Sequence, residues 1–252
     1  MFWRICARLM PRSPLPPPLA ESHDREDFGR FMRQETQLFS ATYARERVRL
    51  RNAVHLRAAA KKGGVLLAML HHGSWILAGG AVAHQLRMPY TVVASRRNLD
   101  HEPEAVRTFW LGVHERGAAL YGQRLLYTDE PAFNAVRWLQ QRGHVLGVVL
   151  DVREGAKRIP EHPFSFCKST VYLQTGPARL ARIAGATVVP MVMIYNARQA
   201  VHELHFLPPV PHGLSDIDTT QAALQAIQPL FEASKQQAFY DIVGVCSAPF
   251  CA

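Results

Sequence analysis

Short, continuous runs of apolar residues alternate with amphipathic stretches along most of the chain. Four of the runs are rich in β-branched residues and are predicted as strands: residues 65–70, 90–94, 145–150 and 187–194. The stretches between them repeat apolar positions at helical spacing and are predicted as helices: residues 76–86, 103–116, 130–142 and 174–184. Strands that are apolar on both faces need helices on both faces. The pattern therefore predicts an α/β fold with a mixed, mostly parallel central sheet flanked by helices.

The pattern is less regular toward both ends of the chain. Residues 11–18 contain five prolines and are predicted as a linker. An N-terminal amphipathic segment and this linker together make up residues 1–24. A single α/β domain follows over residues 25–252. Within residues 21–60 the apolar positions have helical spacing, which predicts a helical N-terminal extension. Residues 204–210 are predicted as a late edge strand, and residues 218–237 as a last helix.

The amino-acid composition and net charge indicate which classes of molecule the protein binds. The 252 residues are 48% hydrophobic and 19% charged, as in globular proteins, and 29 Lys+Arg against 20 Asp+Glu give a net charge of +9. This charge favours phosphates, a membrane surface or nucleic acid as partners. Nucleic acid is the least favoured, because the basic residues are not interleaved with aromatic residues in a stacking pattern. The four cysteines include no C-x-x-C pair, so we expect neither a disulfide framework nor a metal site.

Two basic segments suggest contact with a membrane surface. Arg4, Arg8 and Arg12 share one side of a helix whose other side is apolar, which predicts an interfacial helix. The alternatives are a short helix packed on its own domain and a frayed terminus. Residues 45–62 are also strongly basic, and form either a solvated helix face or a surface that rests against phosphates. No apolar stretch reaches the ~18–20 residues that a transmembrane helix needs.

A histidine and an aspartate stand where two of the predicted strands end. His71 follows the run 65–70 and precedes Gly73, which would allow close approach of a substrate, and Asp151 follows the run 145–150. If both strands lie in one parallel sheet, the two side chains emerge at the same edge, where functional groups of α/β proteins gather. A carboxylate there could hold the imidazole in one tautomer and stabilise its protonated form. Among 12 histidines and 20 acidic residues, a chance pairing is the alternative explanation.

Four short motifs occur in one order along the chain. They are HHGSW at 71–75, SRRNLD at 95–100, DVREG at 151–155 followed by Pro163 and Phe164, and TGPARLA at 175–181 followed by GATVVP at 185–190. Together they resemble the motifs of the lysophospholipid acyltransferase superfamily, in its lipid A late (lauroyl/myristoyl) acyltransferase branch. The likeness extends over roughly residues 25–240. It implies an α/β domain that transfers acyl groups.

The first motif departs from the pattern of that superfamily. An Asp or Glu usually stands five residues after the histidine, and the equivalent position in this chain is Ile76. Mycobacterial phosphatidylinositol mannoside acyltransferases, in the same superfamily, pair their histidine with a distant acid near the later strand end. That resemblance implies Asp151 as the partner of His71, with Glu154 as the second choice. The missing acid leaves a catalytically silent relative, which binds lipid or a partner enzyme, as the alternative function.

The resemblance implies a mechanism in which His71 is the general base. The donor would be a fatty acyl thioester carried by acyl carrier protein or CoA, and no other cofactor and no metal is expected. The acceptor would be a hydroxyl or amine of a lipid-like molecule or a small metabolite. Backbone N–H groups from Gly73 to Trp75 would receive the oxyanion, with Ser74 as the N-cap of the following helix.

Further residues are expected to bind substrate groups. Guanidinium groups bind phosphate in bidentate fashion, which makes arginines near the motifs candidates for phosphates of the donor or acceptor. The candidate substrate-binding residues are Arg96, Arg97, Arg116, Arg153, Thr175 and Gly176. The resemblance and the basic charge together imply a peripheral position on an anionic membrane surface, at the cytoplasmic face of the inner membrane.

Overall fold

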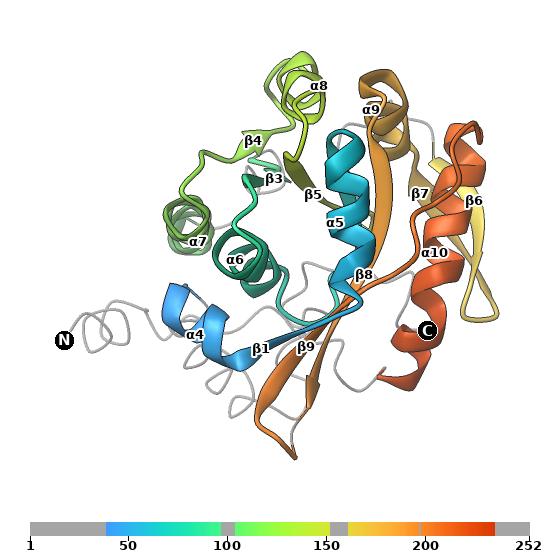
Figure 1. Cartoon of the computed structure of the whole chain (residues 1–252). Helices are drawn as coiled ribbons and strands as arrows, with labels where there is room; N and C mark the ends of the chain where they lie inside the picture. Colours follow the sequence, from blue (N-terminus) through green and yellow to red (C-terminus); the bar gives the residue numbers. More distant parts are fainter. Residues whose placement is uncertain (1–38, 97–103, 152–160, 197, 235–252) are drawn as a thin grey trace.

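A mixed, mostly parallel sheet forms the centre of the protein, in agreement with the predicted fold class. The computed structural model describes residues 39–96, 104–151, 161–196 and 198–234. Within these residues the main sheet has seven strands in the order β1-β9-β8-β2-β5-β3-β4 (Figure 1). They are β1 (Val48–Arg51), β2 (Val65–Met69), β3 (Tyr90–Ala94), β4 (Leu126–Tyr127), β5 (Val145–Val149), β8 (Thr187–Asn196) and β9 (Val201–Phe206). Strands β8, β2, β5, β3 and β4 are mutually parallel, β9 is antiparallel to β8, and β1 is parallel to β9.

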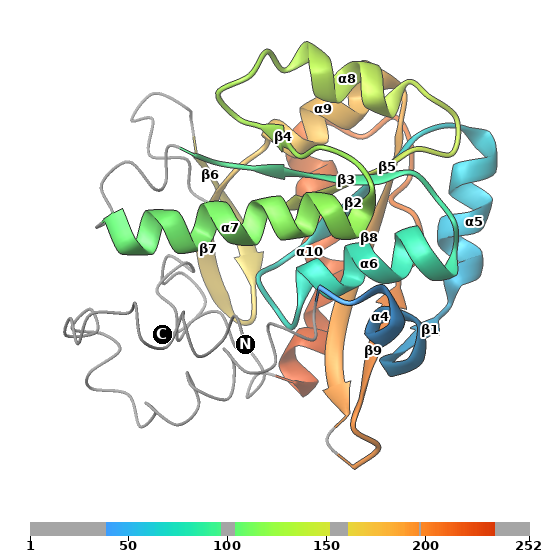
Figure 2. The same cartoon turned by 90° about the vertical axis from the view of Figure 1, so that its left-hand side faces the viewer.

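Helices cover both faces of this sheet. The described helices are α4 (Ala41–Arg47), α5 (Ala53–Lys62), α6 (Trp75–Gln85), α7 (Glu104–Tyr121), α8 (Phe133–Leu139), α9 (Gly176–Ala184) and α10 (Asp216–Ala233). Helices α4, α6 and α7 lie on the face turned to the viewer in Figure 2, and α9 and α10 lie on the other side of the sheet. None of the helices in the described residues is long and apolar enough to cross a membrane.

Strand β2 shows why the central strands read as unbroken apolar runs. All five of its residues are buried. Val65, Leu67 and Met69 join the core under α4, α5, α6 and α7, whereas Leu66 and Ala68 join the core under α8, α9 and α10. Successive side chains point to opposite faces, so a strand that is covered on both faces must be apolar at every position.

Five strands differ from the prediction, and one of them, β4, lies in a segment for which no strand was predicted. Strand β1 lies inside the segment predicted to be helical, and β9 lies between β8 and β1 rather than at the edge of the sheet. A separate antiparallel hairpin, β6 (Glu161–Phe166) and β7 (Ser169–Gln174), was not predicted. Its two turn residues, Cys167 and Lys168, have left-handed φ angles of 49° and 65°. Such turns favour glycine or asparagine, so the chain lacks the usual sequence signal for this hairpin.

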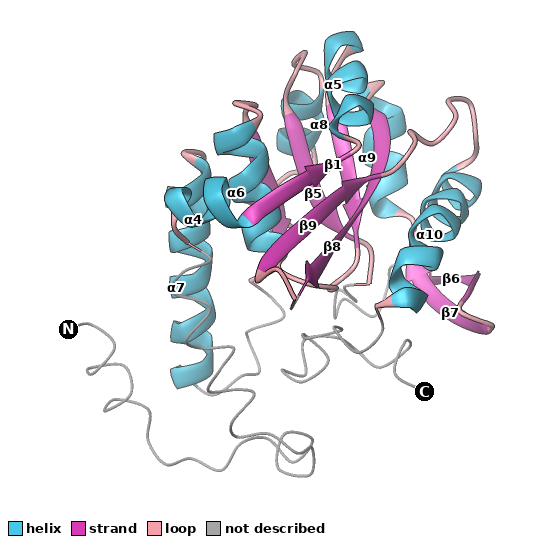
Figure 3. Cartoon of the chain, turned by 60° about the horizontal axis from the view of Figure 1, so that its bottom comes forward, coloured by secondary structure: helices cyan, strands magenta, loops and turns pink. Residues whose placement is uncertain are grey.

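Strand β8 is longer than its neighbour β2. Its last residue paired with β2 is Pro190, opposite Ala68, but the strand continues to Asn196. Over this extension it pairs with β9, and the two strands form a hairpin that projects from the sheet (Figure 3). The side of β8 that faces β2 is therefore left to the loop that follows β2. This loop carries the first sequence motif.

Candidate active site

His71 and Asp151 meet at the carboxyl ends of two neighbouring strands. Met69 pairs with Val149 at the ends of β2 and β5, and the two side chains follow within two residues. His71 Nδ1 lies 3.1 Å from Asp151 Oδ1, and the backbone N–H of His71 donates to both carboxylate oxygens, each at 3.1 Å. The carboxylate thus holds both the backbone and the ring of the histidine. The position at one sheet edge is the one expected from the sequence.

This geometry sets the chemistry that the imidazole can perform. Asp151 is 1% exposed and His71 is 7% exposed, so the carboxylate and the ring are both buried. A carboxylate beside Nδ1 favours the tautomer that carries its proton on Nδ1, which leaves the lone pair on Nε2. The negative charge also stabilises the imidazolium that forms when Nε2 takes up a proton. A histidine in this arrangement can act as a general base.

Gly73 has a structural role in the loop after β2. Its φ of +69° lies in the left-handed region. A Cβ at this position would lie 2.4 Å from the backbone carbonyl oxygen of Met193 in β8. The space beside the glycine is therefore filled by the extended strand, and the expectation that it admits a substrate is wrong. Glycine is needed here because the loop packs directly on the backbone of β8.

The start of helix α6 supplies backbone donors next to this loop. Ser74 is the N-cap, and its hydroxyl accepts a hydrogen bond from the N–H of Leu77 at 3.2 Å, which confirms the predicted capping role. The N–H groups of Trp75 and Ile76 in the same turn have no acceptor within the helix. They are the groups with which this helix start could receive an oxyanion.

The position that usually carries the acid belongs to the core. Ile76 is 1% exposed and packs in the cluster that contains Leu77 and Tyr90. An ionised carboxylate at this position would be buried among apolar side chains, which is unfavourable unless it is paired. The acid beside His71 comes from the turn that follows β5 instead of from α6.

His72 has a different environment from that of His71. Its Nε2 lies 2.7 Å from the hydroxyl of Ser234, which itself donates to the carbonyl of Leu230 at 2.6 Å. The hydroxyl must then accept from His72, so the ring carries its proton on Nε2. Burial lowers the pKa of His72 from its usual value to about 4, and the charge of Asp151 offsets only part of this effect. His72 is therefore a neutral side chain that ties the loop to the end of α10.

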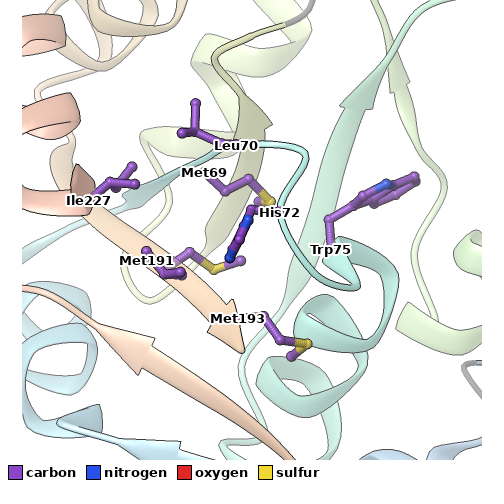
Figure 4. Close-up of a pocket in the computed structure, with 8 residues that line it drawn as sticks. Met69, Leu70, His72, Trp75, Met191, Met193 and Ile227 are labelled. Atoms are coloured by element: carbon purple, nitrogen blue, oxygen red, sulfur yellow. The ribbon is translucent and has the colours of Figure 1, made fainter. Parts of the chain in front are cut away.

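Apolar side chains surround His72 in a narrow recess. The recess lies where β2 ends and β8 continues, and Figure 4 shows the imidazole among its lining side chains. The lining residues are Met69, Leu70, His72, Trp75, Met191, Val192, Met193 and Ile227. Trp75 is partly buried and also packs on the core, which favours a packing role for it. Most of these side chains are buried and fill the recess, so the lining packs around His72 and leaves no room for a ligand.

Of the candidate arginines, Arg96 lies at the same edge of the sheet as His71. It follows β3, which pairs with β5, so it is two strands, or about 10 Å, away from β2. Its guanidinium carbon is 3.7 Å from the centre of the Tyr127 ring, and its Nη1 is 3.5 Å from Asp129. The stacked guanidinium is about half exposed and keeps its charge accessible. Tyr127 was not singled out in the sequence, because no motif links it to Arg96.

The other candidates are placed differently. Arg116, on α7, stacks on the Phe39 ring at 4.8 Å and is not brought to His71 by any contact within the described residues. Thr175 is the N-cap residue of α9 without a side-chain capping bond, and Gly176 is exposed. Three further candidates lie outside the described residues: Arg97, Arg153 and Glu154. The N-terminal amphipathic segment lies outside them as well.

Comparison with known families shows which family the described fold and site resemble in sequence. The model of the family described as bacterial lipid A biosynthesis acyltransferase matches residues 25–234. No curated protein matches the chain at a significant level. The family match covers most of the chain and includes all four sequence motifs, with the strand ends that carry His71 and Asp151.

Proposed function

The chain belongs to the bacterial lipid A biosynthesis acyltransferase family and is an acyltransferase, and we propose that it uses His71 as the general base to acylate a membrane lipid. The donor in this proposal is a fatty acyl thioester of acyl carrier protein or CoA. The acceptor is a hydroxyl or amine of a lipid of the class that the family description names. The contact between His71 and the buried Asp151 is the observation that carries the proposal.

The proposed reaction proceeds without a covalent acyl-enzyme. His71 Nε2 takes the proton of the acceptor as its oxygen or nitrogen attacks the thioester carbonyl carbon. The carbonyl oxygen becomes an oxyanion, which the N–H groups of Trp75 and Ile76 are suited to receive. The intermediate collapses with loss of the thiolate, which takes the proton back from His71 and leaves as the free thiol. Asp151 stabilises the imidazolium between these two proton transfers.

The position of Asp151 also bears on the catalytically silent alternative. That alternative rested on the absence of an acid at position 76. A carboxylate 3.1 Å from Nδ1 can perform the same task from the turn that follows β5, and this supports an active enzyme over a silent relative.

The proposal is tested by acyl transfer with the purified full chain. Acyl-CoA and acyl carrier protein thioesters of several chain lengths are incubated with a lipid A precursor, and the products are identified by mass spectrometry. We expect an acceptor whose mass is increased by one fatty acid less one water, because an acyl group replaces one hydrogen. His71→Ala should lower kcat by about 10²–10⁴, the usual contribution of a general base.

A matched control is the neighbouring histidine. His72→Ala removes an imidazole that is bonded to Ser234, so it should lower stability but change kcat less than tenfold. Equal losses of kcat in the two variants would reject the assignment of His71. Thioester hydrolysis without any acylated lipid would reject a lipid acceptor.

A further inference from the structure

The fold divides the basic stretch of residues 45–62 between two ends of the molecule. Strand β1 begins beside the turn of the β8–β9 hairpin, because Val48 pairs with His202 and His202 pairs with Tyr195. Helix α5 then leads to the opposite end of the sheet, where the carbonyl of Gly64 accepts from the N–H of Thr187 at the start of β8. The sequence suggested that residues 45–62 form one basic surface. In the fold this stretch is divided, so its basic residues do not form one continuous surface.

Three arginines gather at the hairpin turn. Arg49, on β1, donates a hydrogen bond to the side chain of Gln199 in the turn, and Arg198 precedes that glutamine. Arg47 ends helix α4, directly before β1. All three side chains are exposed, and none has an ion pair with an acidic residue among the described residues. We call Arg47, Arg49 and Arg198 the hairpin arginines.

Nearby acidic groups leave this charge largely uncompensated. Glu203, on β9, is paired with Arg51 at 2.8 Å, so these two charges balance each other. Residues 41–51 and the hairpin residues 198–206 contain one other acidic residue, Glu46, which is exposed on α4. Three arginines against one glutamate give a positive surface at the turn. Charged side chains of this kind retain their attraction for anions over about 8–10 Å at physiological salt.

The hairpin connects this surface to the candidate active site. The Met193 carbonyl contacts Gly73, in the loop that carries His71. Strand β8 ends three residues later, at Asn196. At ~3.3 Å per residue, the turn lies about 10 Å further along the strand. A surface that rests against the turn is therefore close to the loop of the proposed general base, whereas the far end of α5 is not.

We propose that the hairpin arginines bind the phosphate groups of anionic phospholipids and hold the loop of His71 at the bilayer surface. This inference rests on the proposed function, in which the acceptor is a membrane lipid whose reactive group must reach His71 while its chains stay in the bilayer. Guanidinium groups bind phosphate through two parallel hydrogen bonds, and a juxtamembrane cation attracts an anionic leaflet.

The sequence of residues 1–38, which precede the described fold, indicates a lipid rather than an acidic protein as the partner of the hairpin arginines. Residues 1–38 join the described fold at α4, which carries Arg47. Their first twelve residues combine Arg4, Arg8 and Arg12 with apolar residues at helical spacing. A segment of that composition is suited to an interface between headgroups and acyl chains, and offers apolar area that an acidic soluble protein does not need.

Vesicle sedimentation with matched triple variants tests the proposal. The first variant is Arg47→Gln/Arg49→Gln/Arg198→Gln, and the second is Arg57→Gln/Lys61→Gln/Lys62→Gln, on α5. Both lose three positive charges from exposed positions, so only the place of the charges differs. The vesicles contain phosphatidylglycerol and phosphatidylcholine, and vesicles of phosphatidylcholine alone give the uncharged reference. Circular dichroism and the thermal midpoint show that each variant is folded.

We expect the first variant to bind the anionic vesicles about 100-fold more weakly than the unmodified chain. Each arginine should contribute roughly a fivefold factor in affinity, and the three factors multiply. The second variant should bind less than about fivefold more weakly than the unmodified chain. Equal weakening in both would show that only net charge matters, and unchanged binding of the first would show that the hairpin does not dock. If that variant instead raises KM for acyl carrier protein and keeps its vesicle binding, the surface serves the carrier protein. Vesicle binding needs no turnover, so these outcomes are separate from a failure of acyl transfer.

Discussion

Replacing Asp151 with asparagine removes the charge beside His71 while keeping the size of the side chain. In the unmodified protein the carboxylate accepts from both Nδ1 and the backbone N–H of His71. The amide has one oxygen left to accept with, and its NH₂ group would face one of these two donors. Asp151→Asn should therefore disturb the tautomer of His71 and remove the stabilisation of its protonated form.

The magnitude follows from the distance between the two groups. Opposite unit charges 3.1 Å apart attract by about 5 kcal/mol at an effective dielectric constant of about 20. Part of this is offset by the cost of burying both charges. We therefore expect the barrier to rise by about 3–5 kcal/mol, which is a loss of about 10²–10⁴ in kcat at 1.36 kcal/mol per factor of ten. Binding of the thioester should change little, because asparagine has the size of the aspartate it replaces.

The assay is release of free thiol from the acyl donor, measured with a lipid acceptor at several pH values. Asp218→Asn, on α10 near its N-cap Ser215, is the matched control and should keep its kcat. A folded Asp151→Asn variant with kcat within threefold of the unmodified enzyme would refute the pairing and direct attention to Glu154.

Three further predictions concern stability. Gly73→Ala should lower the free energy of unfolding, measured by urea denaturation, by about 3 kcal/mol or more, because it adds left-handed strain and a clash with β8. Gly122→Ala is the control: this glycine also has a left-handed φ (+66°) but no atoms near its added Cβ, so the loss should be only about 1–2 kcal/mol. Equal losses in the two variants would contradict the clash. Burial lowers the pKa of three histidines to about 4, so the unfolded chain binds protons that the folded chain does not as pH falls from 6.5 to 4. The free energy of unfolding should fall over that window by up to about 3 kcal/mol for each of His72, His114 and His202, and a pH-independent value would oppose this. Lys168→Gly, at a left-handed turn position, should raise the thermal midpoint by about 2–4 °C in calorimetry, and a lower midpoint would disprove the strain.

The sequence predicts the strands that are covered on both faces more fully than the others. Of the other described strands, β9 alone is predicted, with a shifted range and at the wrong place in the sheet. Strands β2, β3, β5 and β8 are unbroken apolar runs, because each packs against two layers of helices. Strand β1 alternates arginine with apolar residues, and its flanks are basic and helical, so it is hidden in a helical pattern. The β6–β7 hairpin contains Pro163 and has no glycine at its turn, which removes both of its usual signals.

The candidate site likewise contains features that the sequence predicts and features that it does not. The sequence places His71 and Asp151 after strands that share one edge of the sheet, and the resemblance to the acyltransferase superfamily implies Asp151 as the partner. The bond between His72 and Ser234 depends on where the end of α10 packs, and no local pattern carries that information. The requirement for Gly73 likewise depends on how far β8 extends past β2, which is a property of the tertiary fold.

The sequence distance between His71 and Asp151 has a consequence for the making of the enzyme. The two residues are 80 positions apart, and the pairing of β2 with β5 brings them together. At ~5–20 residues per second, the ribosome makes the histidine about 4–16 s before its acid. A nascent chain that ends before β5 therefore has the base without its partner. The onset of turnover during synthesis would report that the centre of the sheet has closed.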